Sequence, residues 1–156
     1  MKIKKSPLIL KDYFVLDFQY TFHQPTEEIN REEVFDSYLI DFDFMTKTDE
    51  DGETLLFTKI GINFSEKPTV GYSILVESLT VLDVNSEFKL APKEKGDLIY
   101  FSGLSMAINN LRHFIANMTS YSPMGKYTLP SVDLNAIHQE KMKELEKEKN
   151  LKKKKK

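Results

Sequence analysis

Few residues in this sequence have the type and spacing that catalysis requires. Asp41 and Asp43 are two positions apart in an alternating segment, so they share one face of a strand, where paired carboxylates could bind a metal ion or act as acid and base. The alternation favours a simpler interpretation, in which both lie on a solvated sheet face. Exposed carboxylates also lack the desolvation that tunes a catalytic pair. We therefore do not expect an enzyme.

The other candidates for chemistry are scattered. His23, His113 and His138 lie on different predicted elements and lack the H-x-H or H-x-x-x-H spacing of a zinc site. Ser102 is not flanked by the glycines of a nucleophile elbow, and no glycine-rich phosphate loop is present. There is no cysteine to act as nucleophile or metal ligand. The sequence thus predicts no catalytic residue, no metal and no cofactor.

Composition and charge narrow the class of protein. The chain has 156 residues, 40% of them hydrophobic and 29% charged, which is the balance of one globular domain. Residues 139–156 hold nine of the 22 basic residues and four of the 24 acidic ones, so that segment has a net charge of +5 and the remainder −7. An acidic body argues against nucleic-acid binding. We expect one domain over residues 1–138 and a charged helical or disordered tail over residues 139–156.

The sequence also indicates a compartment. The absence of cysteine shows no adaptation to an oxidising environment. Residues 7–10 are too short for the apolar region of a secretory signal, and no run of 18 apolar residues could span a membrane. We expect a cytoplasmic protein without direct membrane insertion.

Alternating apolar and polar residues predict four strands. The first covers Tyr13–His23, the second and third form a hairpin over Ser37–Phe64, and a more apolar fourth strand covers Tyr72–Val84. We expect loops at residues 25–33 and 87–96. Alternation places Phe14, Leu16, Phe18, Tyr20 and Phe22 together on one face of a half-buried strand. The aromatic residues expected to line the buried face of the sheet are Phe14, Phe18, Phe42, Phe44 and Phe57.

A helix with few charges follows the strands. From Leu98 to Tyr121 apolar residues recur every three or four positions, and Arg112 is the only charged residue. An exposed helix face normally carries several charges, so we expect another subunit to cover the second face in a dimer or tetramer. The residues expected at this interface are Phe101, Leu104, Ile108, Leu111 and Ile115.

A second helix is expected after Asp133, which is a suitable N-cap. Like charges four residues apart make its distal part fray. The lysines at 152–156 could contact RNA, ribosomes or anionic lipid, or form a solvated tail. The fold class is therefore α+β, with a four-stranded antiparallel sheet packed on a long helix and followed by a second, C-terminal helix.

Three short segments resemble a known family. Leu129–Ile137, LPSVDLNAI, resembles the segment before the last helix of SecB-type export chaperones, where the pattern is P-V-N-F-D-A-L. Gly52–Phe57, GETLLF, resembles that family's G-E-x-T-A-F-L, and Ile9–Asp12, ILKD, its Y-x-K-D. The segments occur in the family's order along nearly the whole chain.

The resemblance implies a polypeptide-binding function without a cofactor. SecB-type proteins pair into dimers, and two dimers sandwich their long helices into a tetramer that holds non-native polypeptides in apolar grooves. Tyr121, Tyr127 and Leu129 lie in a loop punctuated by glycine and proline, and they could line such a groove or belong to the core. The positions that match the family's groove are Leu56, Phe57, Leu134 and Ile137.

The family also docks the SecA-type translocase motor through acidic residues on the exposed sheet face. Asp12 and Asp17 could serve that role here, although Lys59 stands where the family pattern has glutamate. The resemblance therefore implies a holdase that binds unfolded or precursor polypeptides for export. Two alternatives are a SecB-like chaperone of a toxin–antitoxin system and an interaction subunit that shares the fold without binding clients.

Overall fold

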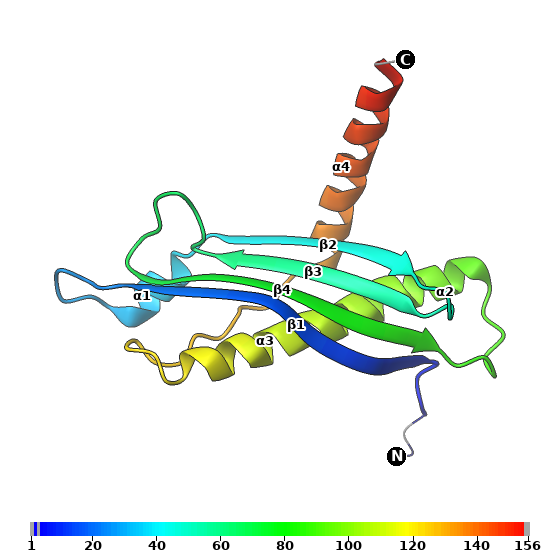
Figure 1. Cartoon of the computed structure of the whole chain (residues 1–156), viewed down its shortest axis with the longest axis horizontal. Helices are drawn as coiled ribbons and strands as arrows, with labels where there is room; N and C mark the ends of the chain where they lie inside the picture. Colours follow the sequence, from blue (N-terminus) through cyan, green and yellow to red (C-terminus); the bar gives the residue numbers. More distant parts are fainter. Residues whose placement is uncertain (1, 3, 155–156) are drawn as a thin grey trace.

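The computed structural model consists of a sheet, a long helix beneath it and a C-terminal helix that projects away from them (Figure 1). It describes residue 2 and residues 4–154, and the side chains of these except at residue 145 and from residue 148 onward. The last two lysines of the predicted tail lie outside the described residues. The elements in chain order are β1 (Leu8–His23), α1 (Arg31–Asp36), β2 (Ile40–Thr48), β3 (Thr54–Ile62), β4 (Gly71–Val84), α2 (Pro92–Leu98), the π-helical turn η1 (Ile99–Gly103), α3 (Leu104–Thr119) and α4 (Leu134–Lys154).

The strands form one antiparallel sheet in the order β1-β4-β3-β2. β2, β3 and β4 follow one another as hairpins, while β1 pairs with β4 along its whole length from Leu8 to His23. This places β1 and β2 at the two edges, so the chain between them must cross the end of the sheet. The α+β class and the four-stranded antiparallel sheet are confirmed.

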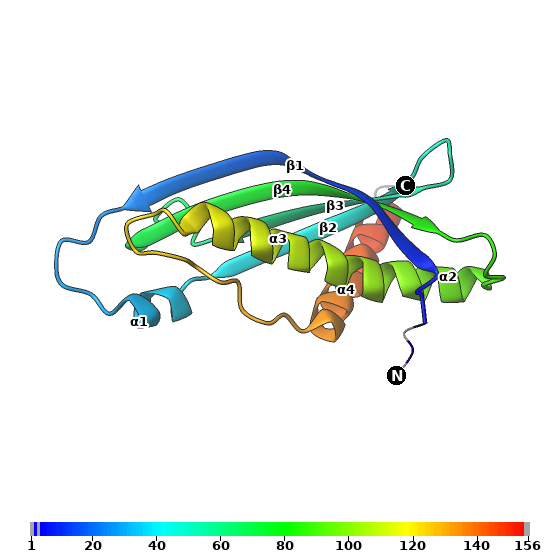
Figure 2. The ribbon, with the colours of Figure 1, turned by 90° about the horizontal axis from the view of Figure 1, so that it is seen from below.

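One face of the sheet carries the hydrophobic core. α3 lies across this face, and no helix covers the opposite face in the part of the chain that the structure describes (Figure 2). We call the uncovered side the open face. Burying an aliphatic side chain stabilises the fold by about 1.5–3 kcal/mol relative to leaving it exposed, so the contact between helix and sheet is a main source of stability. The buried residues at this contact include Leu56, Ile60, Ile74, Val76 and Leu82 of the sheet and Leu104, Ile108, Leu111 and Ile115 of the helix.

β1 departs from the predicted alternation. Its register with β4 shifts at Lys11 and again at Leu16, each an extra residue in a β-bulge. Phe14 and Leu16 therefore lie on the open face, where they are 49% and 54% exposed. The prediction that both face the core is wrong, because alternation assumes a straight strand. The residues of β1 that do pack against the core include Val15, Phe18, Tyr20 and Phe22.

The hairpin aromatic residues divide between the two faces. Phe42 and Phe44 pack on the core, as predicted. Phe57 pairs with Met45 and Leu79 on the open face, because it alternates with side chains that point to α3. The prediction that Phe57 faces the core is therefore wrong.

The long helix begins earlier than predicted. It starts at Pro92, and α2, η1 and α3 follow without a break to Thr119, so the expected loop at residues 87–96 ends within it. Glu94 accepts a hydrogen bond from the backbone N–H of Ala91, which satisfies a donor at the helix start. At Gly103 the helix passes so close to β4 that a Cβ would overlap the Leu82 side chain.

Two further helices frame the sheet. α1 begins within the segment predicted to be a loop at residues 25–33 and continues to Asp36, and Asn30 caps it by accepting from the N–H of Glu32. α4 begins as predicted after Asp133, whose carboxylate accepts from the N–H groups of Asn135 and Ala136. Within the described residues, no helix is long and apolar enough to cross a membrane.

Candidate functional site

The candidate catalytic side chains do not converge. Asp41 and Asp43 share the open face of β2 and are exposed. Asp43 forms an ion pair with Lys141 of α4, and this hydrogen bond raises the pKa of Lys141. Among residues 2 and 4–154 there is no group of three or more His, Cys, Asp or Glu side chains placed to hold a metal ion.

The histidines also remain apart. His23 ends β1, His113 is exposed on α3, and His138 of α4 packs edge-on against Tyr100 with ring centroids 4.5 Å apart. Each imidazole therefore has a separate environment.

A furrow of about 640 Å³ opens at one end of the sheet. Its walls come from α1, from the start of β2 and from residues 126–130. A hollow of this size accommodates several side chains of a bound molecule. The furrow is lined by Glu32, Phe35, Asp36, Tyr38, Ile40, Lys126, Tyr127, Thr128 and Pro130.

The inner wall of the furrow is a cluster of aromatic rings. Tyr127 meets Phe35 edge-on at a centroid distance of 5.2 Å and Tyr38 at 5.7 Å, and Tyr72 lies 5.5 Å behind Phe35. The Tyr38 hydroxyl accepts from the N–H of Tyr72 at 2.7 Å and donates to the carbonyl of Val70. Packed and hydrogen-bonded rings of this kind form an ordered wall, in which Tyr38 and Tyr127 are only 6% and 2% exposed.

Burial makes the tyrosines in and behind the furrow wall harder to ionise. It raises the pKa of Tyr72 and of Tyr127 to about 12, with a smaller contribution from neighbouring groups. The Tyr127 hydroxyl has no hydrogen-bond partner among the described residues, whereas the Tyr72 hydroxyl donates to the carbonyl of Gly125 and accepts from the N–H of Met124. The wall therefore has little charge, and its charges lie at the rim, on Glu32, Asp36 and Lys126.

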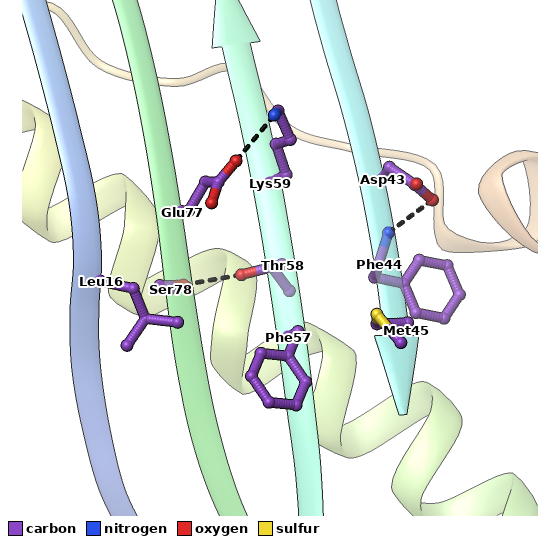
Figure 3. A pocket seen from close by; sticks show the side chains of 9 residues that line it. All are labelled: Leu16, Asp43, Phe44, Met45, Phe57, Thr58, Lys59, Glu77 and Ser78. Carbon is purple, nitrogen blue, oxygen red and sulfur yellow. Dashed lines mark hydrogen bonds and ion pairs between the residues drawn. The ribbon is translucent and has the colours of Figure 1, made fainter. Parts of the chain in front are cut away.

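A second apolar surface lies on the open face of the sheet. The sheet patch consists of Phe14, Leu16, Met45 and Phe57, and Figure 3 shows three of these side chains on the side of the sheet away from α3. The hollow here, about 240 Å³, is smaller than the furrow. A row of charges crosses the strands beside it, in which Lys59 and Glu77 form an ion pair of 2.7 Å that raises the pKa of Lys59.

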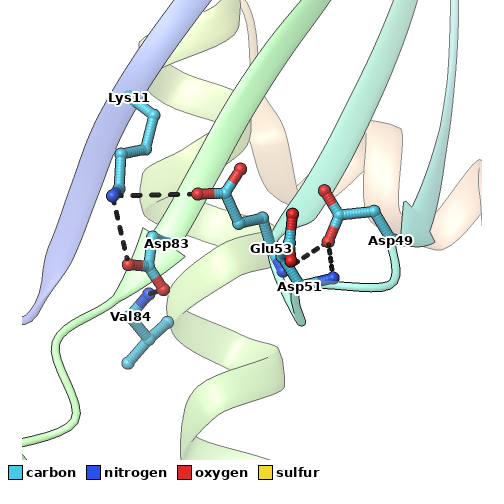
Figure 4. A network of polar contacts seen from close by, with 6 residues as sticks. All are labelled: Lys11, Asp49, Asp51, Glu53, Asp83 and Val84. Atoms are coloured by element: carbon cyan, nitrogen blue, oxygen red, sulfur yellow. Dashed lines mark hydrogen bonds and ion pairs between the residues drawn. The ribbon is translucent and has the colours of Figure 1, made fainter.

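Acidic residues surround the sheet patch. Asp12 and Asp17, the predicted docking residues for a motor, are both exposed on β1. Asp17 pairs in register with Glu77, and its carboxylate accepts from the Gln19 amide. Near the β2–β3 turn, Lys11 bridges Glu53 and Asp83 at 3.7 Å each (Figure 4). Lysines thus offset part of the acidic charge of this face.

The structure separates the predicted polypeptide-binding residues. Tyr127 and Leu129 are buried, and Leu56 is buried at the sheet–helix contact with 1% exposure. Phe57 belongs to the sheet patch, and Tyr121 is 97% exposed in the turn after α3. Leu134 and Ile137, half-buried, pack against the core at the start of α4. Only Tyr127 of this set lines the furrow, and the binding role of every residue in the set stays a prediction.

The residues predicted for the oligomer interface do not all lie on the surface. Leu104, Ile108, Leu111 and Ile115 fill the core beneath the sheet, because they lie on the face of α3 that meets β3 and β4. Their side chains are thus already covered within the chain. Phe101 is 40% exposed, and the remainder of the exposed helix face is mostly uncharged, including Asn109, His113, Asn117 and Met118.

Phe35 and Tyr38, which form much of the furrow wall, are not among the binding residues predicted from the sequence. Phe35 follows the segment predicted to be a loop, and Tyr38 falls within the hairpin predicted over Ser37–Phe64. The signal was nevertheless present, because Asn30 is a good N-cap and is followed by apolar residues at helical spacing in Val34, Phe35 and Tyr38.

Comparison with known proteins identifies the fold. No protein-family model matches the sequence, and no curated protein sequence matches it. A SecB-like chaperone from Mycobacterium tuberculosis, solved in complex with a peptide from an antitoxin, superimposes with a TM-score of 0.59 and 12% sequence identity, covering 81% of this chain and 91% of that chain. A Streptococcus agalactiae protein of unknown function aligns with a TM-score of 0.39 and 11% identity over 80% of this chain and 97% of its own. The first similarity shows that this chain has a SecB-like fold.

Proposed function

We propose that this protein is a chaperone that holds non-native polypeptide segments in the furrow. The observation that carries the proposal is a preformed aromatic wall with an open mouth, formed by Phe35, Tyr38 and Tyr127. Such a surface buries apolar side chains of a flexible chain without requiring a cofactor. Binding of this kind lowers the concentration of free unfolded chain by mass action.

The SecB-like fold supports the proposal, because the mycobacterial protein that shares it is a chaperone bound to a peptide. The rim of the furrow suggests the chemistry of the client. Glu32 and Asp36 stand at the α1 side and Lys126 at the other. We expect segments in which basic residues flank apolar or aromatic ones to bind best, since charge complementarity guides encounter and register.

Filling the furrow tests the proposal. Thr128 is exposed and lines the furrow, so Thr128→Trp occupies its space without disturbing the core. We expect the unaltered protein to suppress light scattering by a denatured client at stoichiometric amounts and the variant to bind a client peptide at least about tenfold more weakly, equivalent to about 1.4 kcal/mol. Thr48→Trp is the matched control, because Thr48 is exposed at the opposite end of β2.

The outcomes separate the holdase from its rival. Failure of the unaltered protein to suppress aggregation would sink the proposal and favour an interaction subunit with the same fold. Equal affinity of Thr128→Trp and Thr48→Trp would leave a holdase whose clients bind elsewhere. The rival gains some support from Leu56 and Tyr127, which are buried in one core, but the furrow beside Tyr127 remains open.

Two purposes fit a holdase of this fold. In the first, export, the acidic open face docks a SecA-type motor, and Asp12→Asn with Asp17→Asn should weaken motor binding without changing client affinity, measured by titration against the purified motor. In the second, the client is the antitoxin of a toxin–antitoxin pair, which is the kind of peptide bound to the mycobacterial structure. Co-expression decides between them, since the second purpose predicts that loss of the chaperone releases toxin activity.

The proposed assembly is a homo-oligomer through the uncharged outer face of α3. The exposed residues include Asn109, His113, Asn117 and Met118 of α3 and Phe101 of the preceding turn η1. An oligomer would place several furrows on one particle, and the resulting avidity would strengthen the hold on a long client.

A further inference from the structure

Arg112 is the only charged residue of the helix between Leu98 and Tyr121, and its side chain reaches out of the helix to the furrow wall. Its Nε donates to the carbonyl of Leu129 at 2.9 Å, and its Nη2 donates to the carbonyl of Pro130 at 3.1 Å. Two consecutive carbonyls thus accept from one guanidinium. The planar fork of arginine suits this arrangement, which an ammonium group cannot reproduce.

The guanidinium has no carboxylate to neutralise it among the described ion pairs. Its third contact is with the amide of Asn109, one turn earlier on α3, whose oxygen accepts from Nη1. This contact fixes the direction of the side chain from the helix side. The charge is therefore directed to the backbone of residues 129–130 and not to a salt bridge.

The held segment needs such support because it has no regular secondary structure. Residues 126–130 lie outside every helix and strand, so their backbone groups must find other partners. Thr119 accepts from the N–H of Tyr127 at 2.9 Å at one end, and Arg112 binds the other end. Tyr127 and Leu129 point inward and are buried, so the segment lies between the core and the guanidinium.

We propose that Arg112 is a positioning residue that sets the client affinity of the furrow by fixing the wall formed by residues 126–130. The inference rests on the proposed function and names a residue outside the furrow that influences how tightly the furrow binds its client. Lys126, Tyr127, Thr128 and Pro130 all line the furrow, so a shift of this segment changes the width of the site. Preorganisation of this kind lowers the cost of ordering on binding.

Loss of Arg112 should loosen the wall without unfolding the domain. The contact with Pro130 is at the surface, so water can replace the guanidinium there, while the core beneath α3 is untouched. We expect Arg112→Ala to lower Tm by no more than about 5 °C. The amide of Tyr127, which donates to Thr119, should exchange with deuterium at least about tenfold faster, because local opening of the segment costs less free energy. Client affinity should fall by at least about tenfold.

The experiment compares hydrogen exchange and peptide affinity in four full-length proteins. These are the unaltered chain, Arg112→Ala, Arg112→Lys and Lys93→Ala. Arg112→Lys restores one charge-assisted hydrogen bond and should recover part of both losses, while Lys93→Ala removes a positive charge from exposed α2 and should change neither. A purely structural role would lower Tm without this graded recovery of affinity.

The two readouts distinguish the failures. Unchanged exchange at the Tyr127 amide in Arg112→Ala overturns the positioning role, and so does faster exchange with unchanged client affinity. If the unaltered chain binds no client, the proposed function fails, and exchange still decides whether Arg112 holds the segment.

Discussion

The furrow and the sheet patch both present apolar side chains, but they differ in what lies behind them. The furrow's rings pack on a second layer of rings and are fixed by hydrogen bonds such as that from the Tyr72 N–H to the Tyr38 hydroxyl. The sheet patch lies on the backbone of the sheet, and the charged row of Lys59 and Glu77 runs beside it.

This difference makes the furrow the better candidate for a binding site and the sheet patch a candidate for a flat contact with another protein. A concave wall that is already ordered surrounds an inserted side chain, whereas a flat patch covers it from one side only. The residues of the furrow also serve the core, while those of the patch contribute little to it. Substitutions in the furrow should therefore change both stability and client binding, whereas substitutions in the sheet patch should leave stability unchanged.

The largest expected effect compares leucines on the two faces. Leu56 is buried beneath the sheet, so Leu56→Ala should lower the free energy of unfolding by about 2–5 kcal/mol. Leu16 is more than half exposed, and Leu16→Ala should change it by less than about 0.5 kcal/mol. Urea unfolding followed by circular dichroism measures both. A loss above about 1 kcal/mol for Leu16→Ala would show that the patch is covered in solution.

An intermediate effect is expected at Gly71, which has a φ of 93° and lies against the furrow wall. A Cβ there would overlap the Tyr38 hydroxyl, so Gly71→Ala should cost about 1–3 kcal/mol for the backbone and also displace the Tyr38 ring. Thermal unfolding and peptide titration are the measurements. Gly52→Ala is the control, because Gly52 has a φ of 84° with open space around it. Equal effects of the two substitutions on client affinity would contradict a preformed wall.

The smallest effect at neutral pH concerns the buried tyrosines, whose contribution to stability changes only at high pH. Tyr72 and Tyr127 have a pKa of about 12 when folded and near 10 when unfolded, so they hold their protons more tightly in the folded state. Stability should be constant to about pH 9 and fall as the pH rises through 10 to 12. Tyr127→Phe removes one of these groups and a hydroxyl without a partner, so it should change stability at pH 7 by less than about 1 kcal/mol and reduce the alkaline loss. Urea unfolding at pH 7, 9 and 11 would detect it.

Sequence reasoning located the parts of the fold that local pattern determines. The hairpin around Gly52, the fourth strand and the cap at Asp133 were all predicted, because turn chemistry and periodicity act within a few residues. The bulge at Leu16 was not, since an extra residue in β1 is stabilised only by its pairing with β4. The charged start of the long helix at Pro92 likewise lies in a segment whose local pattern predicts a loop.

The candidate site was harder to predict than the fold. Tyr127 was among the predicted binding residues, but its partners Phe35 and Tyr38 come from a segment far away in sequence. Only the crossing of the chain from β1 to β2 brings α1 next to residues 126–130. The family resemblance at Leu56 and Leu134 marked positions that this chain uses in or against its core.

The bulge at Leu16 has an evolutionary consequence. A strand that gains one residue in this way keeps every side chain before and after it on its original face. Deleting Leu16 should restore a straight ladder from Val15 to Asp17 with the core unchanged. The insertion or deletion of a single codon can therefore add or remove an apolar contact point on the open face, so this surface can evolve new partners without a compensating change in the interior.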